Sequence, residues 1–311
     1  MPDATTAQDL EGRPRRNLIT NPVALKELRS RMRGRRAFVV LTVYLLLMSL
    51  FILLVYLAYL AASRDSFGPS SRQAGKAVFA AVLAAEVFLV IFVGPAFTSG
   101  AISGEKERQT YDLLRTTLLP ARALVSGKLI SALSYVYLLI LVSVPLQSIA
   151  FMLGGVSPIE VLLSQFLVGL SAVTFALIGL FFSSAMRTTL TATITTFGAA
   201  MFLTFAVPMF AGIAAAVLGQ VVFGGPSPGW LLETLIYYLG LFLSATNLPA
   251  TLIISEVILL EEDALLFFEQ TVGGRSITLF SPWVAYAIIY VVLALLLFWG
   301  TVRRVKRVPR A

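Results

Sequence analysis

The residues best suited to chemistry in this chain are a glutamate and two glutamines placed inside long apolar runs. Glu86 lies near the middle of the second such run, and Gln147 and Gln165 lie in the matching halves of the third and fourth. A carboxylate at the centre of a hydrocarbon layer costs ~2.5–3.5 kcal/mol, so such residues commonly serve a function. The three side chains could line one polar level of a path through the layer. Alternatively, a protonated Glu86 hydrogen-bonds a neighbouring helix and stabilises packing.

Other chemistries are excluded by the residue types that the sequence lacks. The chain contains no cysteine and no histidine, which removes disulfides, Cys or His metal sites and His-based nucleophile systems. It also has no phosphate-binding loop of the type Gly-x-x-x-x-Gly-Lys-Ser/Thr. The pair Gly127-Lys128 fails this pattern because Arg122 replaces the first glycine and Leu129 replaces the hydroxyl residue.

The apolar runs that hold these residues predict an all-α polytopic membrane protein. The 311 residues are 58% hydrophobic with a mean hydropathy of +0.88, whereas soluble domains are about 45–50% apolar. About 20 apolar residues in a helix cross the hydrocarbon layer. Six runs meet this length and form one transmembrane domain over 37–301. They are 37–62, 77–99, 129–153, 159–183, 192–219 and 283–301.

The basic residues orient these spans. With the N- and C-termini in the cytosol, 20 of the 24 Lys and Arg residues fall on the cytosolic side. We expect a disordered tail over 1–20 and a basic tail over 302–311. The net charge of +8 then serves contact with anionic lipids and requires no nucleic acid.

The external region 220–282 holds a further apolar stretch, 231–260, that is interrupted near its middle. If it crossed the membrane fully, the basic C-terminal tail would emerge outside. We therefore expect two short re-entrant or interfacial helices hinged at Asn247-Leu248-Pro249, where proline removes a backbone donor.

The segment 21–36 predicts an amphipathic helix that lies in the membrane interface. Asn21 suits the N-cap and Pro22 the first helical position. The apolar stripe is Leu25, Leu28 and Met32, and the flanking cations include Lys26, Arg29 and Arg33. This helix is either a simple basic anchor or a connecting helix that moves the first span.

The insert 103–128 between the second and third runs is rich in charge and contains a second short amphipathic helix. Tyr111, Leu114 and Leu118 recur at helical spacing after Thr110, a suitable N-cap, and Pro120 ends the run. The apolar face of this helix either binds a partner or packs on the ends of the chain's own spans.

The insert resembles the cytoplasmic signature of ABC-2 type permeases, the membrane subunits of ATP-driven exporters. The insert departs from the family pattern at Gln109, which replaces the usual glycine, and in "TTLLPAR" around the proline. The matching residues are Gly104, Glu105, Lys106, Glu107, Arg108, Thr110, Asp112, Leu113, Leu114, Thr117, Gly127 and Lys128. The resemblance implies a coupling helix seated on a separate ATPase subunit. Its coupling residues are Gly104, Glu105, Glu107, Arg108, Thr110, Tyr111, Asp112, Leu113, Leu114 and Leu118.

The same resemblance implies a permease subunit with no catalysis of its own, in a multi-pass arrangement in the plasma membrane, the bacterial inner membrane in particular. ATP and Mg²⁺ would be held by the ATPase, and a second permease copy or a sister permease would complete the translocation path. Two alternatives stay open: a membrane enzyme using Glu86 and Glu256 as carboxylates, and a channel or scaffold that needs no nucleotide. The sequence does not identify the transported substrate.

Overall fold

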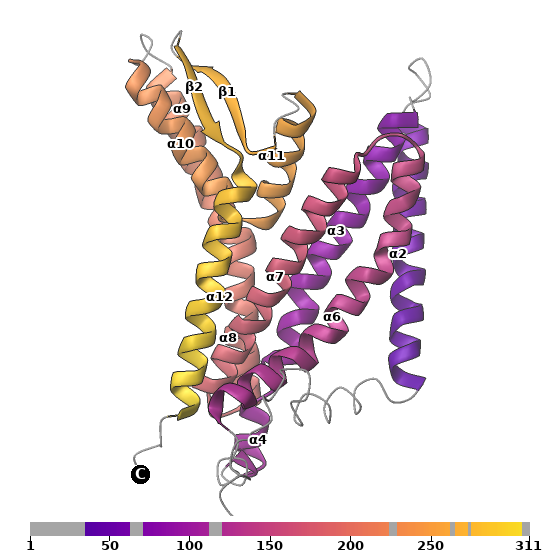
Figure 1. Cartoon of the computed structure of the whole chain (residues 1–311), viewed down its shortest axis with the longest axis vertical. Coiled ribbons are helices and arrows are strands. Elements are labelled where there is room, and N and C mark those ends of the chain that lie inside the picture. The colour runs from indigo at the N-terminus through magenta and orange to yellow at the C-terminus, as the bar shows by residue number, and fades with distance from the viewer. Residues whose placement is uncertain are drawn as a thin grey trace, which may run out of the picture.

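The fold of the chain is mostly helical. The computed structural model describes residues 35–62, 71–111, 120–223, 229–261, 265–272 and 275–306. Within these ranges six helical segments are long and apolar enough to cross a membrane, as the sequence predicted (Figure 1). They are α2 (Arg35–Ala62), α3 (Ser71–Thr98), α6 (Ala121–Met152), α7 (Pro158–Ala185), the composite of α8 (Thr189–Met201), η2 (Phe202–Ala206) and α9 (Val207–Phe223), and α12 (Pro282–Lys306).

Local sequence signals explain where several helices begin. Ser157 caps α7 by accepting a hydrogen bond from the Glu160 amide (3.2 Å), and Pro158 occupies the first turn. The third span begins at Ala121, directly after Pro120, and not at the predicted residue 129. The last part of the insert is therefore helical, because nothing after Pro120 interrupts the helix. The last helix likewise continues to Lys306, into the predicted tail.

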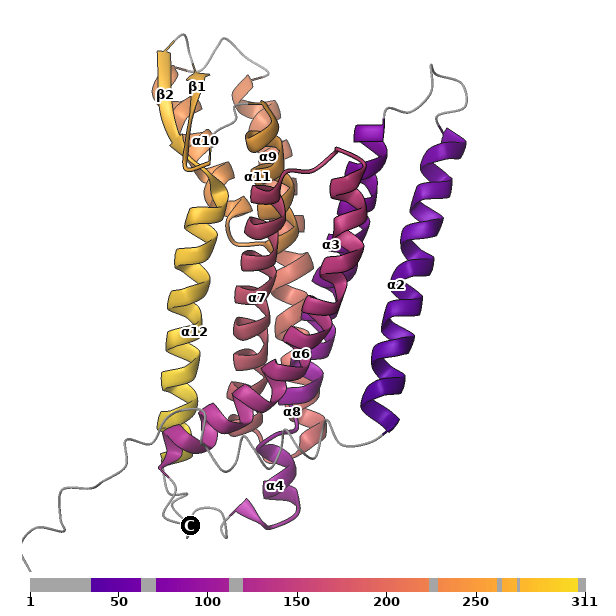
Figure 2. The same cartoon turned by 45° about the vertical axis from the view of Figure 1, so that its right-hand side comes forward.

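Two helices form the centre of the bundle. Helix α3 packs against α6 and α7, and α7 also packs against α8 and α12. Their shared core includes the buried residues Val82, Val90, Leu167 and Phe175. Helix α2 lies at the side (Figure 2), and only 11% of its apolar window is buried. Most of its surface is thus left for lipid or for another chain.

The fifth span is interrupted by one π-helical turn, η2. Pro208 has no amide proton to give to the carbonyl of Thr204, four residues earlier. The side chain of Asn247 supplies the missing donor. Its Nδ2 donates to the Thr204 carbonyl (2.7 Å) and to the Leu203 carbonyl (3.3 Å). The Asn247 Oδ1 accepts from the Ala250 amide (3.1 Å).

The predicted external region contains two short helices and a hairpin. α10 (Trp230–Ser244) and α11 (Leu248–Glu261) are separated at Asn247, where the hinge was predicted. A β-hairpin of β1 (Phe267–Val272) and β2 (Arg275–Phe280) follows, in the antiparallel register Val272↔Arg275. Phe268 and Leu279 of the hairpin pack on Ile258 of α11. The hairpin was not predicted from the sequence. Within the described residues, the other elements are helical.

Candidate functional site

The three predicted polar residues of the spans meet in one buried cluster. Glu86 on α3 is fully buried, and its Oε1 accepts hydrogen bonds from Gln147 Nε2 (3.0 Å) and Gln165 Nε2 (3.0 Å). Gln165 Nε2 also donates to Oε2 (2.9 Å), and the Ser143 hydroxyl donates to Oε1. Polar side chains of α6 and α7 thus surround a carboxylate of α3.

The hydrogen bonds of this cluster link three helices of the bundle. The donors around Glu86 are neutral, and they join α3 to α6 and α7. Two large apolar pockets open on the surface of α3, and neither is lined by Glu86, Gln147 or Gln165. Glu256, the other carboxylate considered for a membrane enzyme, lines one of these pockets without Glu86. The structure therefore does not bring the two carboxylates into one cleft.

The signature run forms the short helix α4 (Ser103–Glu107) at the end of the bundle where α12 ends (Figure 2). Its first charge, Glu105, forms a salt bridge with Lys128 of α6 (2.6 Å). Lys128 Nζ also donates to the Ala101 carbonyl (2.8 Å), and only 4% of its side chain is exposed. This pair fixes the start of α6 against the end of α3.

The next two charges bind the facing ends of two other helices. Lys106 Nζ donates to the carbonyls of Ser184 (2.6 Å) and Met186 (3.0 Å), at the C-terminus of α7. Glu107 accepts from the amide (2.8 Å) and the hydroxyl (2.9 Å) of Thr189, at the N-terminus of α8. The cation thus lies at the negative end of one helix dipole and the anion at the positive end of the next.

Ser183 of α7 completes the attachment. Its Oγ accepts hydrogen bonds from the amides of Ile102 (2.9 Å) and Ser103 (3.0 Å), which begin α4 and have no partner within that helix. We call Ile102, Ser103, Glu105, Lys106 and Glu107 the α4 staple. Through it, the turn after α3 is bonded to the ends of α6, α7 and α8.

The remaining predicted coupling residues divide into three groups. Arg108 and Thr110 are exposed after the staple, and Tyr111 is half-buried beside it. The space around Gly104 does not require glycine, because an added Cβ would lie 3.5 Å from Thr189 Cγ2, an ordinary van der Waals distance. Outside the described residues lie Asp112, Leu113, Leu114 and Leu118, and also the interfacial residues Leu25, Lys26, Leu28, Arg29, Met32 and Arg33.

Four side chains that bond the staple to other helices were not predicted as site residues. They are Lys106, Lys128, Ser183 and Thr189. The alternation of charges in Glu105-Lys106-Glu107 was the available signal. The reason for this alternation is clear only when the end of α7 and the start of α8, which lie beside it, are known.

The six apolar helical segments, four of which are joined at one end by this polar turn, define a multi-pass membrane protein. The family model described as ABC-2 family transporter protein matches residues 21–303, which is most of the chain. The chain therefore belongs to the ABC-2 transporter family, and it is a membrane component of a transport system. A search of curated proteins found no significant match.

Proposed function

We propose that the chain is the permease subunit of an ATP-driven ABC-2 exporter and that a separate ATPase subunit drives it through the turn around α4. The α4 staple is the observation that carries this proposal. Because its bonds reach the ends of α6, α7 and α8, a displacement of the turn would move three spans together. A partner that pulls on this turn could thereby change the access of the translocation path.

The ATPase partner would supply the nucleotide-binding site that this chain's sequence lacks. With no phosphate-binding loop here, ATP and Mg²⁺ belong to the ATPase. The side chains of Arg108 and Thr110 remain exposed next to the staple. The predicted apolar residues Leu113 and Leu114 follow in the sequence and would supply the buried contact, at about 1.5–3 kcal/mol for each side chain.

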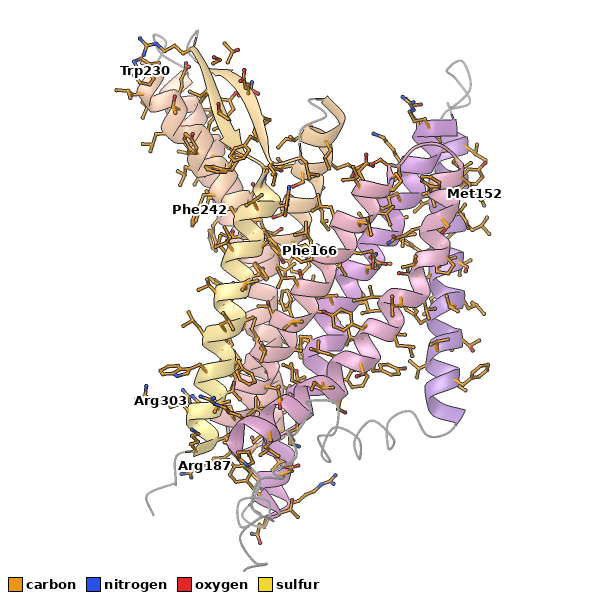
Figure 3. All side chains as sticks on the ribbon, viewed as in Figure 1. Met152, Phe166, Arg187, Trp230, Phe242 and Arg303 are labelled. Atoms are coloured by element: carbon orange, nitrogen blue, oxygen red, sulfur yellow. The ribbon has the colours of Figure 1, made fainter. Side chains whose placement is uncertain are left out.

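The distribution of cations supports a cytosolic position for α4. Arg187 and Arg303 lie at the α4 end of the bundle (Figure 3), and Arg304 and Lys306 end the same helix as Arg303. Cytosolic loops are rich in such residues, and the anionic lipid surface attracts them. The chain would then reside in a plasma membrane, the bacterial inner membrane in particular, and would pair with a second permease.

Substitution of Leu114 by Asp tests the proposal. The charged side chain should abolish co-purification of the ATPase, because it removes apolar contact and places an unpaired charge in the interface. Membrane insertion should be unchanged. The control is Thr278→Asp on the exposed face of the hairpin, which should retain the ATPase. Full ATPase recovery with Leu114→Asp would refute the proposed coupling surface.

A further inference from the structure

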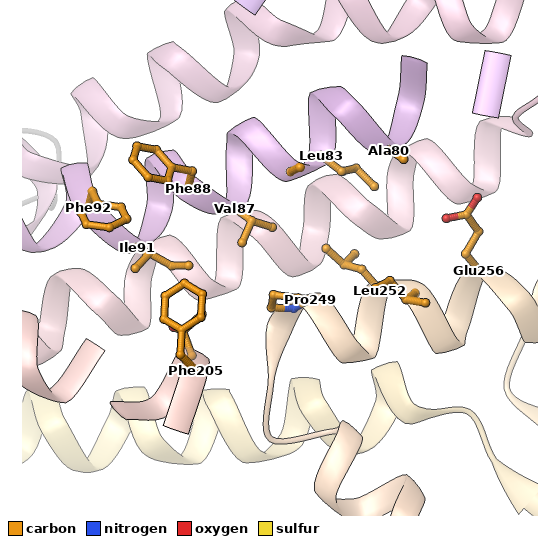
Figure 4. Close-up of a pocket in the computed structure, with 13 residues that line it drawn as sticks. Ala80, Leu83, Val87, Phe88, Ile91, Phe92, Phe205, Pro249, Leu252 and Glu256 are labelled. Atoms are coloured by element: carbon orange, nitrogen blue, oxygen red, sulfur yellow. The ribbon is translucent and has the colours of Figure 1, made fainter. Parts of the chain in front are cut away.

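An apolar pocket of about 300 Å³ lies between α3, η2 and α11 (Figure 4). Side chains of α3 and α11 face each other across it, and Glu256 lies at one end. Its lining includes Leu83, Val87, Ile91, Phe205, Pro249 and Leu252. This volume is at the lower end of the range of about 300–1,000 Å³ that small-molecule sites occupy.

The pocket opens at the side of the bundle. Ala80, Ala84 and Phe88 of α3 recur every four residues, are exposed and line the opening. The two alanines leave the space that larger side chains would fill. Since this face belongs to a membrane span, a molecule dissolved in the lipid layer can reach the pocket directly.

A smaller and more polar void adjoins the apolar pocket. It has a volume of about 20 Å³, which admits one water-sized group. It shares Leu83, Leu252 and Glu256 with the apolar pocket, and Glu160, Ser164 and Ser255 also line it. The two spaces together have an apolar body and a compact polar end.

Two polar atoms at this end have no hydrogen-bond partner within the described residues. Ser255 is 2% exposed, and its Oγ bonds no carbonyl. Helix serines commonly bond a carbonyl of the preceding turn, as Ser164 does with Val161 (2.9 Å). Oε2 of Glu160 is also buried and unpaired. Both atoms are thus available to a group that enters the void.

The polar end also has an excess of negative charge. Within the described ranges, neither Glu160 nor Glu256 forms a salt bridge. Burial, and secondarily the charge of Glu160, raise the pKa of Glu256, while Lys76 of α3 lowers it. Within the described residues, Lys76 is the one cation with a charge effect on Glu256, and it forms no salt bridge with that carboxylate. This arrangement favours a cationic ligand.

We propose that this site binds an amphiphile with one primary ammonium group. The ammonium would lie between Glu160, Ser255 and Glu256, where its three N–H donors match three oxygen-bearing side chains. The alkyl body would lie in the apolar pocket. The inference rests on the proposed function, because it names the class of compound that the exporter would carry.

Binding of a defined probe to the purified full-length chain in nanodiscs tests this assignment. The probe is a long-chain alkylamine that carries a photoreactive diazirine in its chain. It should label α3 and α11 at the pocket. Glu256→Gln and Glu160→Gln should each weaken binding about tenfold, the effect of losing one charge-assisted hydrogen bond. The exposed carboxylate variant Glu269→Gln should bind as the unchanged chain does.

Two matched probes and one filling variant sharpen the test. The alcohol of equal chain length should bind at least tenfold more weakly, and the trimethylammonium analogue should also bind weakly because the void admits only a small group. Ala84→Phe should block labelling, while Ala214→Phe, at an exposed alanine of α9, should not. Equal binding of amine and alcohol, or unchanged binding after both Gln substitutions, would overturn the proposal.

A second copy of the chain is the competing occupant of this face. Because the chain has no native cysteine, Ile253→Cys provides a single reporter at the pocket rim. Efficient disulfide formation between two copies would show that protein covers the opening, and would reject the amphiphile site. All of these assays use the permease without its ATPase. Their failure leaves the coupling proposal intact, and loss of ATPase co-purification leaves this site intact.

Discussion

Gln109 directly follows the staple and has a left-handed backbone, with φ 57°. Glycine adopts this conformation at little cost, whereas other residues pay of order 1–3 kcal/mol. This explains why the resembling signature has glycine at that place. The chain keeps the turn despite glutamine because the hydrogen bonds of the staple fix the backbone on its N-terminal side.

Replacement of Gln109 by Gly should therefore stabilise the turn. We expect the free energy of unfolding to rise by about 1 kcal/mol, measured as an increased midpoint of thermal unfolding in detergent. Gln109→Ala is the matched control and should give no such increase, because alanine retains the Cβ. Equal stabilisation by Ala and Gly would mean that the glutamine side chain, and not the backbone, causes the effect.

The pair of Lys128 and Glu105 predicts a larger effect of the opposite sign. Lys128→Ala leaves the mostly buried Glu105 carboxylate unpaired, which should lower the free energy of unfolding by about 3 kcal/mol. The double variant with Glu105→Ala should recover part of this loss, because it removes the unpaired charge. Additive losses in the same thermal assay would show that the two side chains act independently.

Binding of the alkylamine probe should depend on pH through Glu256. Its raised pKa keeps the carboxyl neutral at pH values where an ordinary glutamate, near pKa 4.3, is already ionised. Affinity should therefore rise as the pH increases through this raised pKa, and then level off while the amine remains charged. Glu256→Gln should flatten the profile while the neighbouring charged groups Glu160 and Lys76 are retained. A profile unchanged by this substitution would exclude Glu256 as the titrating group.

At the scale of elements, the π-turn and the break between α10 and α11 stabilise each other. Asn247→Ala removes the donor to the buried Thr204 carbonyl and should cost about 1–3 kcal/mol. Pro208→Ala added to that variant restores a backbone amide that can bond the same carbonyl. We therefore expect the double variant to lose less free energy of unfolding than the sum of the two single losses, measured by thermal unfolding. Strictly additive effects would contradict this explanation of the π-turn.

Periodicity and apolar length predicted the elements well where they form long spans, because a hydrocarbon layer requires about 20 apolar residues. Their ends were less accurate: α6 begins eight residues before the predicted 129 because Pro120 starts the helix. The hairpin was missed although Gly273-Gly274 separates two runs rich in β-formers.

The candidate sites were predictable to different degrees. Glu86, Gln147 and Gln165 could be grouped from their depth in the spans, and the structure brings them together. Depth alone does not distinguish packing from lining a path, which depends on the faces that the helices turn to each other. The α4 staple was not predictable in this way, because Lys106 and Glu107 bond helix ends about 80 residues away in the sequence.

At the scale of the whole molecule, the two ends of the bundle have separate roles in this account. The α4 end holds the staple and the cations Arg187 and Arg303 (Figure 3), and α11, which lines the pocket proposed for the amphiphile, lies toward the opposite end (Figure 1). Helices α3 and α7 pack along each other between them. A displacement of the α4 turn can reach the pocket through these two helices, since both line the polar void.

The central claim, that an ATPase drives this chain at the α4 turn, is tested most directly by site-specific photocrosslinking in native membrane vesicles. A photoreactive amino acid at position 114 should capture a protein that mass spectrometry identifies as carrying a phosphate-binding loop. The same group at Tyr238, on α10 at the opposite end, should not capture it. Absence of such a protein from the crosslinks at position 114, or equal capture from both positions, would contradict the account.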